Sequence, residues 1–416
     1  MKILFTALDA LQKIVNDKKS FSSAVKEACK GKVSEAARKD VTTVVGCALR
    51  HYLILEHRFL EVLKDENQYV LPCILATSNT LFAKKVSDGE TEKFLRESIE
   101  KEDTLNNVLD LYHAFKDGEP LINKDLDPNC LEFLSYRYNT PFWIVRMWRK
   151  HYGYKDMRRI LMANSKHFNN YGRINNEYID EEKFERENKT FQKTQFDKFY
   201  LYTEKGKVKS SFQYLNKLVY VYPIVFDEII KESDADSFRG IAAFANTPNA
   251  LVSALSANLT SYFEMDFLIG KQQAYFETKQ EKNLYNAKNV HLYEGPSSSG
   301  ITCFSKKVHT FFVLPDSSKF FLLRNTPDYF IHFDQNSLDG LIQEQLQALE
   351  DSAEFVEDGG YLVYYVATNS EKENHGIIEK FLENHKEFSL QNEKRIFSFS
   401  EYDSTCYYAI LRKAEK

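Results

Sequence analysis

Between residues 137 and 173, basic side chains alternate with aromatic ones. This stretch, which we call the basic segment, holds nine Lys and Arg residues against one acid, Asp156, although the whole chain has a formal net charge of −5. Lys and Arg side chains bind phosphates and aromatic rings stack on unpaired bases, so a surface that carries both kinds of side chain suits an RNA loop. The alternative is a solvated basic helix face over an aromatic core. Because ordinary surfaces intersperse both signs of charge, we predict RNA contacts at Arg146, Arg149, Lys150, Arg158 and Arg159.

Other reactive residue types form no recognisable site. The six cysteines are scattered, with no C-x-x-C pair and no cluster with histidine, so we expect reduced thiols, no metal and a cytoplasmic location. Cys303 could act as a nucleophile, but free cysteines are more often small buried hydrophobes. Ser297–Gly300 lacks the lysine and the glycine spacing of a phosphate loop. No apolar run is long enough to span a bilayer, so we expect a soluble protein without a membrane partner.

The elements that position the basic segment change in type along the chain. A length of 416 residues predicts several domains. From Met1 to about Cys130 apolar residues recur at helical spacing, which predicts an all-helical bundle, and the polar stretch Lys124–Pro128 marks its end. Helices are then predicted at Phe142–His151 and Asp156–Ala163, followed by a mixed region whose clearest strand is Leu218–Tyr222.

Beyond Lys231, short β-rich runs alternate with longer helical patterns, which favours a mostly parallel, doubly wound sheet. The predicted strands are Phe238–Ala243, Tyr262–Asp266, Val290–Tyr293, Val308–Leu314, Tyr361–Ala367 and Tyr407–Leu411. The predicted helices are Asn249–Asn258, Lys271–Tyr285, Ser337–Phe355 and Asn374–Asn384.

The basic segment also carries a resemblance. Asn139–Trp143, Ala163–Ser165 and Arg173–Asn175 are similar to the "N-x-P-x-W … A-N-N … R-x-N" pattern of RsmB-type ribosomal RNA cytosine-5 methyltransferases, with only Ser165 departing from it. In that family the pattern belongs to a small α/β domain that helps to bind RNA, which adds Asn164, Arg173 and Asn175 to the candidate RNA contacts. The run Arg38–Glu61 is similar to part of the NusB-like helical domain of those proteins.

Two further motifs extend the resemblance over nearly the whole chain. Leu322–Asp328 is similar to "V-L-R-R-H-P-D", which adds Arg324 to the candidate RNA contacts. Gly359–Tyr364, followed by Glu373-Asn374, is similar to "G-G-x-L-V-Y-x-T-C-S-x-x-x-E-E-N". The resemblance implies a multidomain α plus α/β fold with a NusB-like helical domain (1–129), a small α/β domain (130–230) and a Rossmann-like methyltransferase domain (231–416).

The family's two active-site cysteines have no counterpart in these alignments. Counting back from Pro327 places one of them on Ser317, anchoring on Pro315 places it on Asp316, and the second falls on Ala367. Carbon 5 of cytosine accepts a methyl group only after a thiolate adds to carbon 6. A serine ionises far less readily than a cysteine and an alanine cannot add at all. We therefore expect no intact catalytic residue.

The resemblance also predicts an eroded cofactor site. The family's "D-L-C-A-A-P-G-G-K-T" falls on 239–248, where the paired glycines and the lysine are missing and Phe244 stands beside the turn. Asp266 matches the acid that holds the ribose of S-adenosylmethionine, and Glu294 matches the acid of "G-D-G". The aspartate of the family's "D-A-P-C-S" motif, which also carries the cysteine that falls on Ser317, is replaced here by Leu314. We expect no cofactor, with S-adenosylmethionine as the ligand if the ancestral site still binds one.

Three functions from different classes are consistent with these residues. The favoured one is a catalytically inactive protein that binds structured RNA, with ribosomal RNA during its maturation as the expected target. The second is an active S-adenosylmethionine-dependent RNA methyltransferase that uses an unconventional site. The third is a scaffold that binds a protein partner through the NusB-like bundle, since fold alone does not fix function.

Overall fold

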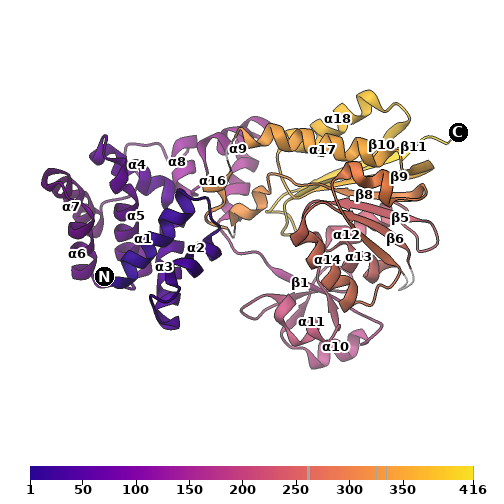
Figure 1. Cartoon of the computed structure of the whole chain (residues 1–416), viewed down its shortest axis with the longest axis horizontal. Coiled ribbons are helices and arrows are strands. Elements are labelled where there is room, and N and C mark those ends of the chain that lie inside the picture. Colours follow the sequence, from indigo (N-terminus) through magenta and orange to yellow (C-terminus); the bar gives the residue numbers. More distant parts are fainter. Residues whose placement is uncertain (260–262, 325, 334, 416) are drawn as a thin grey trace. The chain divides into compact units, whose positions relative to one another are not determined.

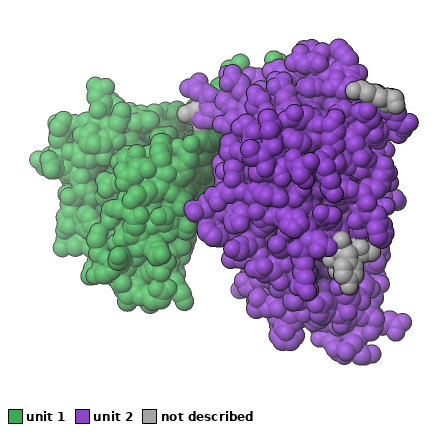
Figure 2. Space-filling view, turned by 45° about the vertical axis from the view of Figure 1, so that its right-hand side comes forward, with its two compact units in different colours: residues 1–166, 322–335 green, residues 167–321, 336–416 purple. Residues whose placement is uncertain are grey.

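The computed structural model describes residues 1–259, 263–324, 326–333 and 335–415, and for Arg324 only the backbone. The chain divides into two compact units (Figures 1 and 2). Unit 1 contains residues 1–166 and 322–335, and unit 2 contains residues 167–321 and 336–416. The division into three domains made from the sequence stays a prediction. In the part of the chain that the structure describes, every helix is too short or too polar to cross a membrane.

Unit 1 is helical, as the apolar spacing predicts. On α1, for example, Leu4, Ala7, Leu11 and Ile14 are fully buried, because residues three and four apart share one helix face. Its helices are α1 (Lys2–Val15), α2 (Phe21–Cys29), α3 (Glu35–Arg50), α4 (Tyr52–Leu63), α5 (Val70–Ser78), α6 (Asp88–Ser98), α7 (Glu102–Lys116), α8 (Leu131–Arg137) and α9 (Phe142–Asn164).

A segment from late in the sequence completes this helical core. The short helix α16 (Tyr329–His332) places Phe330 and Ile331 against the core of the bundle. Asp328 is buried, and its Oδ2 accepts a 2.8 Å hydrogen bond from the backbone N–H of Phe21, the first residue of α2. A carboxylate stabilises a helix at this position because the first-turn amides have no other partner.

Unit 2 contains two sheets. The smaller is antiparallel, with the strand order β2-β3-β1-β4. Its strands are β1 (Asn170–Ile174), β2 (Phe191–Lys193), β3 (Phe199–Tyr202) and β4 (Val219–Tyr220), with α10 (Glu181–Glu187) and α11 (Phe212–Leu215) in its connections and α12 (Val225–Glu232) leading to the second sheet.

The larger sheet has the order β10-β11-β9-β8-β5-β6-β7. Strands β5 to β9 are parallel and β10 and β11 are antiparallel, which confirms the mostly parallel sheet. Figure 1 shows α13 and α14 on one face and α17 and α18 on the other. The strands are β5 (Ile241–Ala245), β6 (Met265–Ile269), β7 (Val290–Glu294), β8 (Val308–Leu314), β9 (Val356–Val366), β10 (Phe388–Ile396) and β11 (Cys406–Lys413); the helices are α13 (Leu251–Asn258), α14 (Gln272–Leu284), α15 (Gly300–Cys303), α17 (Ser337–Ala353) and α18 (His375–Asn384).

The strand predictions differ from the structure at several places, including two predicted starts and one strand that was missed. β5 starts at Ile241 instead of Phe238, whose side chain is 91% exposed. β6 starts at Met265, and the predicted start at Tyr262 lies outside the described residues. β10 was not predicted, because it is an edge strand with polar residues along most of its length.

Candidate functional site

The two positions aligned with the family's cysteines lie at one edge of the large sheet. Strands β8 and β9 are parallel neighbours, so the loops that follow Leu314 and Val366 start at the same edge. Ser317 and Ala367 are in these loops. The residues that follow them are in contact, since Oγ of Ser318 lies 2.6 Å from Oγ1 of Thr368. The structure therefore brings the two loops together and places hydroxyl groups where they meet.

A buried carboxyl group organises these loops. Oε1 of Glu373 accepts hydrogen bonds from the backbone N–H of Ser318 at 2.7 Å and from Nε2 of Gln345 on α17 at 3.0 Å. We call Ser318, Gln345, Thr368 and Glu373 the Glu373 cluster. All four are fully buried, and Glu373 Oε2 and Gln345 Oε1 have no hydrogen-bond partner among the described residues. Burial raises the pKa of Glu373, although the hydrogen bonds from Ser318 and Gln345 oppose the rise.

The Glu373 cluster differs chemically from a thiolate site. It offers two hydroxyls, one amide and a carboxyl whose neutral form is favoured by burial. The sequence motif pointed to Glu373, but nothing in the sequence indicated Gln345, which lies on α17, 28 positions earlier in the chain. In the described residues no group of three His, Cys, Asp or Glu side chains is arranged to hold a metal ion.

The carboxyl end of β5 is where a parallel sheet of this order binds ligands. From β5 the chain adds β6 and β7 on one side, and then β8 and β9 on the other, and ligands occupy the crevice at such a switch point. At this end a Cβ added to Gly270 would lie 1.8 Å from Oδ1 of Asn246, so the Asn246 side chain is packed against the Gly270 backbone. Ala250 has the left-handed φ of +61° that favours glycine.

An ion pair crosses the same place. Lys271, just beyond β6, pairs with Asp316, just beyond β8, and β5 lies between those two strands. Lys319 also pairs with Asp316, at 2.7 Å. Burial raises the pKa of Asp316, but Lys319 and Lys271 outweigh it and hold that pKa below its ordinary value.

The two candidate cofactor acids are separated along the sheet. Asp266 is the second residue of β6, at the end remote from the crevice, and Oδ1 accepts a 3.2 Å hydrogen bond from the Tyr293 hydroxyl. Glu294 is the last residue of β7 and is exposed at the crevice edge. At the carboxyl end of β6 the chain reads Ile269-Gly270-Lys271 and has no acid. The end of β6 therefore offers no carboxylate to accept hydrogen bonds from the ribose hydroxyls of S-adenosylmethionine.

Most of the basic segment lies on one kinked helix, α9, while Arg137 ends α8 and Arg173 lies in β1. Gly153, with φ +75° and ψ 172°, divides α9 into the two helices that the sequence predicts. Ile144, Val145, Trp148, Met157 and Leu161 are buried on one side of the helix, so part of the aromatic and apolar content is core. Arg146, Arg149 and Lys150 are exposed and Arg158 is partly exposed.

The cations of α9 have few acidic partners. Arg159 pairs with Asp156 at 3.1 Å. Among the described residues, no acid pairs with Arg146, Arg149, Lys150 or Arg158. The guanidinium groups of the three arginines lie over aromatic rings instead. The guanidinium of Arg146 is 5.9 Å from the ring centroid of Phe142, and those of Arg149 and Arg158 are 5.6 Å and 5.8 Å from the ring centroid of Tyr154.

Four other candidate RNA residues occupy different surroundings. Arg173 is only 8% exposed, and inside unit 2 it pairs with Asp227 at 3.1 Å and donates to the Ala257 carbonyl at 2.7 Å. Asn175 is 2% exposed, and its side chain accepts from the backbone N–H of Glu177. Both side chains therefore have partners inside unit 2, and their assignment as RNA contacts stays a prediction. Asn164 ends α9 with a buried Oδ1, and the side chain of Arg324 lies outside the described residues.

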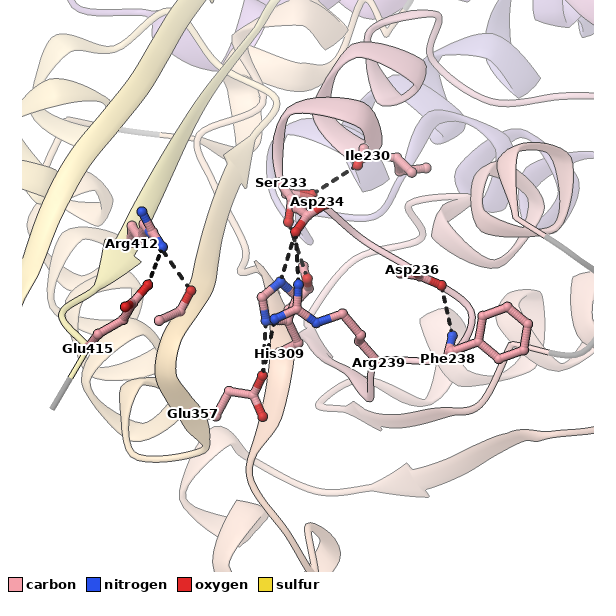
Figure 3. A network of polar contacts seen from close by, with 12 residues as sticks. Ile230, Ser233, Asp234, Asp236, Phe238, Arg239, His309, Glu357, Arg412 and Glu415 are labelled. Atoms are coloured by element: carbon pink, nitrogen blue, oxygen red, sulfur yellow. Dashed lines mark hydrogen bonds and ion pairs between the residues drawn. The ribbon is translucent and has the colours of Figure 1, made fainter.

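The opposite edge of the large sheet carries a separate network of charges (Figure 3). His309, near the start of β8, is 2% exposed and lies between two carboxylates. Its Nδ1 is 3.0 Å from Glu357 and its Nε2 is 3.3 Å from Asp234. Arg239 also reaches Asp234, at 3.0 Å. This network fastens the linker between α12 and β5 to the amino ends of β8 and β9.

Comparisons with known proteins agree with the fold. No protein-family model matches the chain. Ribosomal RNA small subunit methyltransferase B of Thermus thermophilus is 50% identical over 44 residues, which span 11% of this chain and 11% of that protein. The solved structure of PH0851 matches 100% of this chain and 98% of its own at a TM-score of 0.74 and 15% identity.

Two solved structures from Pyrococcus horikoshii match a smaller share of the chain. A methyltransferase homolog protein has a TM-score of 0.58 at 18% identity, covering 69% of this chain and 100% of its own. NSun6, solved with SFG, has a TM-score of 0.59 at 11% identity, and the match covers 66% of this chain and 99% of the NSun6 chain. These likenesses confirm the fold that the resemblance to RsmB-type methyltransferases implied: a helical N-terminal part and a Rossmann-like C-terminal sheet.

Proposed function

We propose that this chain is an RNA-binding protein with a methyltransferase fold that transfers no methyl group, and that it acts on ribosomal RNA in the cytoplasm. The observation that carries the proposal is the set of exposed cations on α9 without acidic partners among the described residues: Arg146, Arg149 and Lys150. Phosphates supply the missing negative charge in RNA complexes. The short match to a ribosomal RNA methyltransferase supports this class of RNA.

The proposed lack of catalysis rests on the carboxyl edge of the large sheet. Neither Ser317 nor Ala367 carries a thiol, and residues of the Glu373 cluster form the contact between the two loops that contain them. The Lys271–Asp316 pair crosses the end of β5, where a cofactor would enter. These residues supply neither a thiolate nucleophile nor an acceptor for the cofactor ribose, so they do not support the cytosine-5 methyl transfer of RsmB-type enzymes.

The test is RNA binding as a function of salt. We expect the intact chain to bind a structured ribosomal RNA fragment, with an affinity that falls as salt rises. Arg146→Ala and Arg149→Ala should each weaken binding and reduce the salt slope by about 1. Arg96→Ala on α6 is the matched control, because Arg96 is exposed but already pairs with Glu92 at 2.7 Å.

Three results would overturn the proposal. RNA binding that is absent or independent of salt would remove the RNA-binding function. Saturable binding of S-adenosylmethionine in calorimetry, followed by transfer of labelled methyl to RNA, would establish the methyltransferase instead. Recovery of a protein partner after nuclease treatment, without any RNA crosslink, would favour the scaffold.

A further inference from the structure

The kink at Gly153 brings two arginines to one aromatic ring. In a straight helix, residues nine apart point in opposite directions, because each residue turns by about 100°. Arg149 and Arg158 would then lie on opposite faces. Gly153 has the left-handed φ of +75°, which a glycine adopts without strain. The resulting change of direction allows both guanidinium groups to lie over the ring of Tyr154.

Resting on the function proposed above, we propose that Arg149, Tyr154 and Arg158 form a phosphate clamp that binds the RNA backbone without reading bases. We call these residues the Tyr154 clamp. In it, Tyr154 positions the two arginines and does not itself stack on a base, because its ring already carries both guanidinium groups.

The charge of the clamp points to an anion. Two guanidinium groups near one ring repel each other, and neither has an acidic partner among the described residues. Contact with the ring holds a guanidinium while its N–H groups stay available. A phosphodiester offers two unesterified oxygens that match the paired N–H groups of an arginine. The missing partner of the clamp is therefore a phosphate group of the backbone.

Tyr154 is itself held in place. Its hydroxyl donates a 2.9 Å hydrogen bond to the carbonyl of Asn129, in the turn before α8. The ring is therefore anchored at one end and carries the arginines on its surface. This arrangement restricts two long side chains before RNA arrives, which reduces the entropy lost on binding.

Two substitutions that leave the net charge unchanged separate the clamp from simple attraction. Tyr154→Leu removes the ring but no charge, and we expect it to weaken binding of a structured RNA fragment about tenfold, since two side chains become free to rotate. Tyr154→Phe keeps the ring and loses only the hydroxyl bond, so its affinity should stay within about twofold of the wild type. Circular dichroism melting of both variants checks that the helical unit remains folded.

A probe without bases tests what the clamp recognises. We expect Tyr154→Leu to weaken binding of an abasic phosphodiester oligomer by the same factor as binding of an oligouridylate of equal length. A loss confined to the oligouridylate would mean that Tyr154 stacks on bases and would overturn the clamp. Wild-type affinity of a folded Tyr154→Leu protein would also overturn it while leaving RNA binding intact, whereas failure of the wild type to bind any RNA refutes the proposed function itself.

Discussion

Replacing Glu373 by glutamine tests whether the buried carboxyl group at the carboxyl edge of the large sheet is neutral in the folded protein. The carboxyl group is fully buried, and burial raises its pKa above the ordinary value of 4.5. A group with a raised folded-state pKa contributes its full stability below the unfolded-state pKa and loses it as pH rises through the folded-state value. The free energy of unfolding of the wild type should therefore decline above about pH 5 through this group.

The magnitude follows from the hydrogen bonds. Glu373→Gln keeps Oε1 as the acceptor for Ser318 and Gln345 and replaces Oε2, which has no partner among the described residues, by an amide group that stays uncharged at every pH. We expect this variant to equal the wild type at pH 5 and to exceed its unfolding free energy by about 1 kcal/mol at pH 8. Glu373→Ala leaves two buried donors unpaired and should cost about 2–5 kcal/mol at either pH.

The assay is urea unfolding at a series of pH values, with hydrogen exchange of the Ser318 amide as the local readout. Glu393→Gln is the matched control, because its stability should depend on pH in the opposite direction. Burial raises the pKa of Glu393, but hydrogen bonds from Tyr407 and His375 hold it below its ordinary value of 4.5. This variant should therefore be less stable than the wild type above pH 4.5, and the difference should shrink as the pH falls below 4.5. If the wild type does not lose stability relative to Glu373→Gln between pH 5 and 8, the folded-state pKa of Glu373 is not raised above its unfolded-state value and the reasoning fails.

Three other substitutions test the remaining structural claims. Arg173→Met should lower the unfolding free energy by about 3 kcal/mol, because it leaves Asp227 without its cation, while RNA affinity of the folded protein stays unchanged; a selective loss of affinity would restore Arg173 as an RNA contact. His309→Ala should cost about 1–3 kcal/mol and speed hydrogen exchange of the Arg239 amide; unchanged exchange would show that the linker is held by other contacts. Lys271→Ala should still show no heat of S-adenosylmethionine binding in calorimetry, since the carboxyl end of β6 lacks an acid; saturable binding would identify the ion pair with Asp316 as the obstacle.

The sequence predicted the type of most elements because their apolar patterns are long and regular. Val308–Leu314 is a run of buried residues and was predicted to the residue. β10 shows the limit of this approach, since an edge strand needs no apolar run. The start of β5 was predicted too early because an aromatic residue favours a strand in any context, whereas Phe238 lies in an exposed linker.

The candidate site was harder to predict because it depends on burial and on distant partners. Arg173 was counted with the RNA-binding cations, since a charge count does not distinguish a surface arginine from one paired with Asp227. Asp266 was assigned to a strand end, yet the strand continues to Ile269. The role of Tyr154 could not be predicted either, because only the left-handed conformation of Gly153 brings Arg149 and Arg158 to its ring.

The two halves of the proposed function rest on different physical requirements. Methyl transfer needs an open crevice with groups aimed at a ligand. At the carboxyl edge Lys271 pairs with Asp316, and Oε1 of Glu373 accepts hydrogen bonds from Ser318 and Gln345. RNA binding needs only exposed cations held in position, and the buried face of α9 and the anchored ring of Tyr154 supply that within unit 1. The proposed loss of methyl transfer at that edge therefore requires no change in the cations of α9, which carry the proposed RNA binding.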